Sequence, residues 1–295
     1  MNASDDLLWP HFAPLWQDLR KVGSGLLVAG GYGLFLKQQW AGNAVGPLIA
    51  IPMERWQNAT PRVTKDLDLI IGLDLISNEI NNGQLLEILE KQGFKVSENP
   101  EGKRWQFFKK LDEHRQVVAE LHAPTPGEKS ANLQADRIRV KHKPSMGEDG
   151  VHGRHNPEAV GCHLNPFRFP CREVEIAVPN PLTWSIMKLV AAEDHWARSR
   201  ASRQDSQQRA FSREQATKHA RDVCRAIAMM TIGERDSAGE IVAAIKDSPQ
   251  FIRAAKISNG SFWNEGNWVH GIVGDQWLPE DLATIHNTLS SWFAA

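Results

Sequence analysis

Residues 64–71, TKDLDLII, interrupt an apolar run with two aspartates. The leucine and isoleucine content is typical of a buried strand. In a strand, residues two apart project from the same face, so Asp66 and Asp68 would share one face while Leu67 and Leu69 occupy the other. Two like charges side by side near a core destabilise a fold unless a cation compensates them. We therefore predict a positive charge beside this strand.

A third carboxylate identifies the kind of cation. Residues 105–109 and 116–122 are predicted to form two further strands, and Glu120 lies on the second of them. If that strand is adjacent to the first, Glu120 comes within reach of Asp66 and Asp68. Oxygen-rich sites of this kind suit Mg²⁺, which would also bridge the phosphates of a nucleotide. The sequence thus predicts Mg²⁺ on these three carboxylates.

Gly30-Gly31 is a candidate phosphate-binding turn. The apolar run 26–29 is too short for a helix and predicts a buried strand, and residues 32–40 are rich in helix formers. A glycine pair between a strand and a helix presents backbone N–H groups at the helix N-terminus, where phosphate binds favourably. Such pairs are also common in ordinary tight turns, so both interpretations stay open.

The predicted elements divide the chain into two parts. Strands and helices alternate in the first part, whereas the chain after Pro181 is mainly helical, with Ser212 and Gln215 in a pattern typical of a capping box. We predict an α/β (α+β) fold, with a mixed sheet in a domain of residues 1–175 and a helical C-terminal domain of residues 176–295. The basic run RIRVKHK at 137–143 is either a solvated strand face or a contact for RNA phosphates.

Composition excludes several classes of protein. The 295 residues are 41% hydrophobic and 23% charged, and 34 basic residues balance 35 acidic ones, so contact with nucleic acid would need a local patch. No basic segment followed by an apolar run opens the sequence, and none approaches the roughly 18 apolar residues of a membrane span. Three cysteines without a framework pattern fit a reducing compartment. We expect a cytoplasmic protein.

The order of these motifs resembles a known superfamily. The glycine pair occurs in VAGGYGLFL, the pattern Arg-x-Thr-x-Asp-x-Asp in RVTKDLDLII, and the third acid in VVAELHAP, in this order along the chain. Two helical segments follow, PLTWSIMKLVAA and KHARDVCRAI. The chain resembles nucleotidyltransferases of the DNA polymerase β type, and within them the AbiEii-type toxins of bacterial toxin–antitoxin and abortive-infection systems. The resemblance covers about residues 25–125 and 178–230. It implies a polymerase-β-like nucleotidyltransferase sheet with a helical region behind it.

The resemblance also implies roles for particular residues. Asp66 and Asp68 would bind Mg²⁺, and Glu120 would ligate metal or activate the attacking hydroxyl. Lys188 and Asp222 match a helical lysine and aspartate that the toxin group needs for activity. The predicted catalytic residues are therefore Asp66, Asp68, Glu120, Lys188 and Asp222. The predicted nucleotide-binding residues are Gly30, Gly31, Arg62, Thr64, Lys65 and Lys218.

Some of these residues also have an ordinary structural interpretation. Lys218 lies four residues before Asp222 and would share its helix face, as a site pair or as an exposed ion pair. Arg62 and Lys65 flank the aspartates, where they would contact phosphate or only balance charge.

By this resemblance the protein would transfer a nucleotidyl group from an NTP to a hydroxyl, with release of pyrophosphate. It would act as a growth-inhibiting toxin on tRNA, with a cognate antitoxin as a possible partner. Two alternatives remain: nucleotidylation (AMPylation) of a protein, and a non-catalytic nucleotide-binding antitoxin or interaction module. The intact aspartate pair argues against the non-catalytic alternative.

Overall fold

Regular alternation of apolar residues builds the central sheet of this protein. The computed structural model describes the chain except for residues 1–5, 44–48, 59, 61–63, 65, 100–103, 128–132, 134–137, 139–149, 202–203, 263–266 and 295. The strands are β1 (Leu26–Val28), β2 (Asp66–Ile71), β3 (Lys95–Val96), β4 (Gln106–Lys110), β5 (Gln116–Ala123) and β6 (Arg154–His155), with a separate pair β7 (Phe167–Cys171) and β8 (Val174–Val178).

The main sheet is mixed, as predicted. Its order is β1-β2-β5-β4-β3, with β6 paired to β5. Strand β2 runs parallel to β5 and antiparallel to β1, whereas β4 is antiparallel to both β5 and β3. The predicted neighbourhood of the two acidic strands is thereby confirmed.

The two faces of β2 and β5 differ in character. On one face Leu67, Leu69, Ala119 and Leu121 are almost completely buried. On the opposite face, Asp66 is exposed and Asp68, Glu120 and His122 are partly exposed, whereas Ile70 is buried. Polar side chains on this open face are therefore accessible although the strands themselves are central.

The helices and short turns follow the chain order closely. They are α1 (Trp9–Val22), α2 (Gly30–Asn43), η2 (Met53–Arg55), α3 (Leu73–Ser77), α4 (Glu79–Lys91), η4 (Pro157–Ala159), α6 (Pro181–Arg200), α7 (Ser206–Ala228), α8 (Ile232–Ile245), α9 (Pro249–Ile257), the π-helical turn η5 (Ser258–Phe262), α10 (Trp268–Val273) and α11 (Pro279–Phe293). The described helices include none long and apolar enough to cross a membrane.

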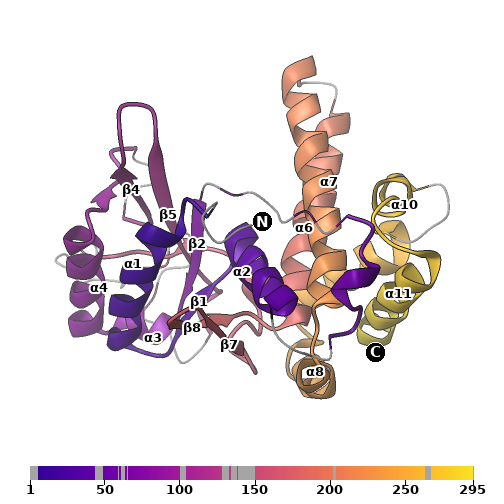
Figure 1. Ribbon diagram of the computed structural model, residues 1–295, viewed down its shortest axis with the longest axis horizontal. Helices are drawn as coiled ribbons and strands as arrows, with labels where there is room; N and C mark the ends of the chain where they lie inside the picture. Colours follow the sequence, from indigo (N-terminus) through magenta and orange to yellow (C-terminus); the bar gives the residue numbers. More distant parts are fainter. Residues whose placement is uncertain are drawn as a thin grey trace. The chain divides into compact units, whose positions relative to one another are not determined.

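Contacts divide the chain into two compact units. Unit 1 comprises Met1–Phe35, Arg62–Pro157 and Arg168–Val178, and it contains the main sheet. Helices α1 and α4 pack together on one side of that sheet (Figure 1). Unit 2 comprises Leu36–Pro61, Glu158–Phe167 and Pro179–Ala295. The division at residue 175 stays a prediction, because compactness alone does not define a domain.

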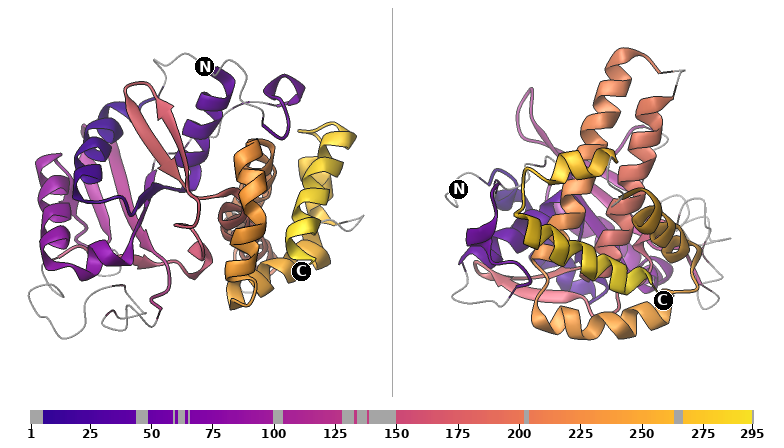
Figure 2. Two further views of the ribbon diagram at one scale, coloured as in Figure 1. Left: turned by 90° about the horizontal axis from the view of Figure 1, so that it is seen from below. Right: turned by 90° about the vertical axis from the view of Figure 1, so that its right-hand side faces the viewer.

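Helices dominate unit 2. Asn180 accepts a hydrogen bond from the Thr183 amide at 2.8 Å and so caps α6, with Pro181 at the first position. Helices α6 and α7 form a long antiparallel pair, and the end of this pair near Arg200 and Ser206 extends beyond α8 to α11 (Figures 1 and 2). A helical C-terminal region is thus confirmed.

The predicted capping box at Ser212 and Gln215 is wrong. Helix α7 already begins at Ser206, because the Asp205 carboxylate accepts from the Gln208 amide at 2.8 Å. Aspartate is a strong N-cap, and the helix formers after it extend the helix through Ser212, which is buried. A capping box does occur at the start of α8, between Thr231 and Glu234.

Candidate metal and phosphate site

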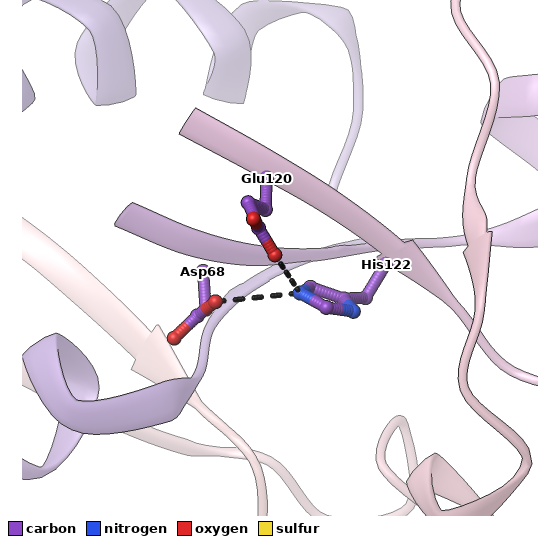
Figure 3. Close-up of side chains that lie close together, drawn as sticks. All are labelled: Asp68, Glu120 and His122. Carbon is purple, nitrogen blue, oxygen red and sulfur yellow. Dashed lines mark hydrogen bonds and ion pairs between the residues drawn. The ribbon is translucent and has the colours of Figure 1, made fainter. Parts of the chain in front are cut away.

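The parallel pairing of β2 and β5 places two carboxylates side by side. Asp68 lies directly opposite Glu120 in the register, and both belong to the open face of the sheet. His122 follows Glu120 by two residues and therefore projects from the same face. Figure 3 shows the three side chains converging from the two strands.

The three side chains form a compact donor set. One ligand atom from each of Asp68, Glu120 and His122 lies within 4.8 Å of the other two. The imidazole Nε2 is 3.3 Å from Asp68 Oδ1 and 3.5 Å from Glu120 Oε2. The side chains are 25%, 17% and 13% exposed for Asp68, Glu120 and His122. A small ligand can therefore reach the cluster while most of the surrounding water is excluded.

His122 supplies compensating charge for the two acids. Burial lowers the pKa of the imidazole, but hydrogen bonds and charge from Asp68 and Glu120 outweigh burial and raise it above 6.5. For Glu120, burial raises the pKa, whereas the hydrogen bond from His122 and its charge prevail and lower it. Part of the cation that the sequence demands is thus a protein side chain, which the sequence analysis missed.

Two polar side chains from neighbouring strands hold Glu120 in place. Gln106, opposite Glu120 on β4, donates a hydrogen bond to Oε1 at 2.8 Å. The Arg154 guanidinium lies 3.3 Å from Oε2, and it also lies over the Trp105 ring at 5.0 Å from the centroid. Such partners orient a ligating carboxylate.

Gly30 approaches the cluster from the start of α2. Its φ of +59° lies in the left-handed region, and a Cβ at this position would collide with the Asp68 carboxylate. The Ala29 amide donates to the Asp68 carbonyl at 2.8 Å, which joins the turn to β2. Glycine is required here because the Asp68 carboxylate occupies the position that a Cβ would need. Gly31, the next residue of α2, is buried.

The other predicted residues of unit 1 lie at the start of β2. Thr64 Oγ1 accepts from the Asp66 amide at 3.5 Å. Asp66 is exposed and projects from the same face as Asp68, but it is not part of the group whose donor atoms lie within 4.8 Å. Its role as a metal ligand stays a prediction. Arg62 and Lys65 lie outside the described residues, as do the basic side chains of the RIRVKHK run.

Lys188 and Asp222 form a pair within unit 2. Lys188 on α6 and Asp222 on α7 are both buried, with Nζ 3.2 Å from Oδ2. Lys218, one turn before Asp222, is half-buried on α7. The spatial pairing of Lys188 with Asp222 could not be predicted from their separation of 34 positions in the chain.

The residues at hand suit a divalent metal ion. Two carboxylates and an imidazole are standard ligands for such ions, and the absence of a Cβ at Gly30 lets the Asp68 carboxylate lie against the start of α2. Comparisons with protein-family models, with curated proteins and with solved structures found no match.

Proposed function

We propose that this protein is a metal-dependent nucleotidyltransferase that moves an NMP group from an NTP to a hydroxyl, with Mg²⁺ as the expected ion. One observation carries the proposal: Asp68 and Glu120 lie in register on parallel strands, and the glycine turn that opens α2 packs against Asp68. Carboxylates hold a cation there, and free N–H groups of the first helical turn attract phosphate. The carboxylates and the helix N-terminus lie side by side, which supports binding of a nucleoside triphosphate together with its metal ion.

The residues of unit 1 have distinct roles in the proposed reaction. Asp68 and Glu120 hold the ion, with Asp66 as a further ligand once substrate is bound. The backbone of Gly30 and Gly31 binds triphosphate oxygens, and Arg62, Thr64 and Lys65 contact phosphate at the start of β2. When bound, a divalent metal ion lowers the pKa of the acceptor hydroxyl and screens the negative charge of the phosphates.

Lys188, Asp222 and Lys218 would act from the helical region. Within unit 2, the Asp222 carboxylate lies 3.2 Å from the Lys188 ammonium group. An ammonium held by a buried carboxylate is pre-organised to offset charge on a phosphate. Lys218 would supply a second positive charge on the same helix.

RNA is the acceptor that we propose, and tRNA is the class implied by the resemblance. Seven basic and only two acidic side chains occur in residues 197–221, a net charge of +5 in a chain whose total is −1. Arg198, Arg200, Arg209 and Arg213 are exposed at the end of the α6–α7 pair. Phe211, also there, is 58% exposed. Arginines with an exposed aromatic ring suit phosphate contact and base stacking.

A labelling assay tests the reaction. The protein, with a divalent ion, is incubated with each α-labelled NTP, total tRNA and a cell lysate, and Asp68→Asn serves as the inactive control. We expect labelled tRNA, with a loss of at least about 10³-fold in the control, because ion binding contributes several kcal/mol to such transition states. Label on a protein would favour protein nucleotidylation. No transfer by a well-folded protein would favour a non-catalytic binding module.

Two charge reversals test the acceptor surface. Arg209→Glu with Arg213→Glu should weaken tRNA binding by about tenfold or more and flatten its salt dependence, because fewer counterions are released. Arg235→Glu, on α8, is the matched control and should bind as the wild type does. Equal binding by both variants would contradict the assignment of this surface. Growth arrest on expression, relieved by Asp68→Asn, would test the proposed toxin role.

A further inference from the structure

The donor set differs from an all-oxygen magnesium site in one atom. His122 Nε2 lies between Asp68 Oδ1 and Glu120 Oε2, at 3.3 and 3.5 Å (Figure 3). Octahedral ligands at about 2.1 Å from an ion lie about 3 Å from one another. The nitrogen is therefore spaced from both oxygens almost as a fellow ligand would be, with little movement required.

We infer that this centre selects a first-row transition-metal ion such as Mn²⁺ over Mg²⁺, with His122 as a direct nitrogen ligand. The inference rests on the metal centre of the proposed function and specifies which ions it takes. Mg²⁺ prefers oxygen and gains little from imidazole, whereas Mn²⁺, Co²⁺ and Zn²⁺ accept mixed oxygen and nitrogen ligands.

The surroundings of the three side chains favour this donor set. Gln106 and Arg154 hold Glu120 from its outer side, so its carboxylate is oriented before an ion arrives. His122 is 13% exposed and is fixed in β5, where its neighbours Leu121 and Ala123 are buried in the core. The strand fixes the His122 backbone, and Nε2 contacts both carboxylates, so the imidazole already lies beside any ion that they hold. Only three ligands come from this cluster, which leaves positions for water or phosphate oxygens.

Calorimetric titration of the nucleotide-free protein with Mn²⁺ and with Mg²⁺ tests the inference. We expect the Kd for Mn²⁺ to be at least about tenfold lower than that for Mg²⁺. His122→Asn should weaken Mn²⁺ binding by about 10- to 100-fold, the range typical of losses around metal centres, while Mg²⁺ binding changes by less than about threefold. His122→Asp should restore an all-oxygen set and reverse the preference. His114→Asn, in the exposed turn between β4 and β5, is the matched control.

A spectroscopic readout keeps the inference falsifiable if the variants fail to fold. Electron spin-echo spectra of Mn²⁺ bound to the wild-type protein should contain modulation from a ligating imidazole nitrogen. Equal affinities for Mn²⁺ and Mg²⁺, or bound Mn²⁺ without nitrogen modulation, would overturn it. The metal-binding measurements need no nucleotide, so they test the choice of ion even if the protein transfers no nucleotidyl group. Conversely, nucleotidyl transfer with Mg²⁺ would support the proposed function even if Mn²⁺ is not preferred.

Discussion

The Lys37–Glu234 pair of unit 2 and the Asp68–Glu120–His122 cluster of unit 1 are built in opposite ways. In unit 2, Lys37 on α2 pairs with Glu234 on α8 at 2.5 Å, and the side chains are only 1% and 4% exposed. In unit 1, the carboxylates of Asp68 and Glu120 share the imidazole of His122, and the three side chains are 13–25% exposed. The first cluster is balanced and sealed, whereas the second has an excess of negative charge and remains accessible.

Additional contacts explain why the first cluster needs no ligand. Glu234 accepts from the Thr231 amide at 2.8 Å and from the Thr231 hydroxyl at 3.0 Å, as part of the capping box. The Lys37 ammonium lies 4.5 Å from the centroid of the Phe167 ring. Burial lowers the pKa of Lys37, and Glu234 acts in the opposite direction. The charges of Lys37 and Glu234 are compensated entirely by protein groups. The Asp68–Glu120–His122 cluster instead has an excess of negative charge that a bound cation would neutralise.

The largest expected effect breaks the balanced cluster. Lys37→Ala leaves Glu234 buried without its ammonium, so we expect the free energy of unfolding to fall by about 3–5 kcal/mol. Urea unfolding monitored by circular dichroism measures the change. Lys246→Ala, at the exposed end of α8, should stay within about 0.5 kcal/mol of the wild type. A loss below about 1 kcal/mol for Lys37→Ala would show that the pair is not sealed.

An intermediate effect is expected where the backbone meets the open cluster. Gly30→Ala strains a left-handed position and forces a methyl group against Asp68, so stability should fall by about 1–3 kcal/mol and metal affinity should fall with it. Gly83→Ala is the matched control, since it lies inside α4 with nothing within 4 Å of a new Cβ, and should leave stability equal or higher by up to about 1 kcal/mol. Similar results for both glycines would contradict the close approach at Gly30.

Removing one acid from the open cluster should cost little stability. Asp68→Asn relieves repulsion with Glu120 and leaves one carboxylate for one imidazole, so we expect a change within about 1 kcal/mol. Calorimetry of the same variant should detect no metal binding. A loss comparable to that of Lys37→Ala would indicate that Asp68 serves the fold rather than a ligand.

The smallest effect is a dependence on pH. The pKa of His122 is raised in the folded protein, so its contribution to stability is complete below about pH 6.5 and is lost as the pH rises through the folded-state pKa. Metal affinity has the opposite slope, because a protonated imidazole cannot ligate, and it should increase with pH over this range. Titrations at several pH values measure both slopes, and His122→Asn should flatten them. An unchanged slope in that variant would exclude His122 as the titrating group.

The strands and the acidic residues of the metal site could be predicted from the sequence. Periodicity located β2 and β5, and like-charge spacing at Asp66 and Asp68 indicated that a cation is required, since both signals are local. The expectation that the strand of Glu120 lies beside the strand of Asp66 and Asp68 was correct, but the register that sets Glu120 opposite Asp68 came only from the structure. The signal for His122 was also present, because it follows Glu120 at the strand period of two.

Other contacts depend on three-dimensional packing alone. Gln106 and Arg154 reach Glu120 from β4 and β6, and nothing in their local sequence indicates a common target. The Lys37–Glu234 pair joins residues 197 positions apart. The strands β7 and β8 were missed because Pro170 and the Arg172-Glu173 turn interrupt the apolar alternation.

The metal centre is tested most directly by diffraction from crystals grown with Mn²⁺, with data collected above and below the manganese absorption edge. We expect an anomalous peak among Asp68, Glu120 and His122, at about 2.2–2.4 Å from Nε2 and from one oxygen of each carboxylate. A fully occupied Mn²⁺ elsewhere in the protein, or an empty cluster with His122 still bonded to both acids at millimolar Mn²⁺, would contradict it.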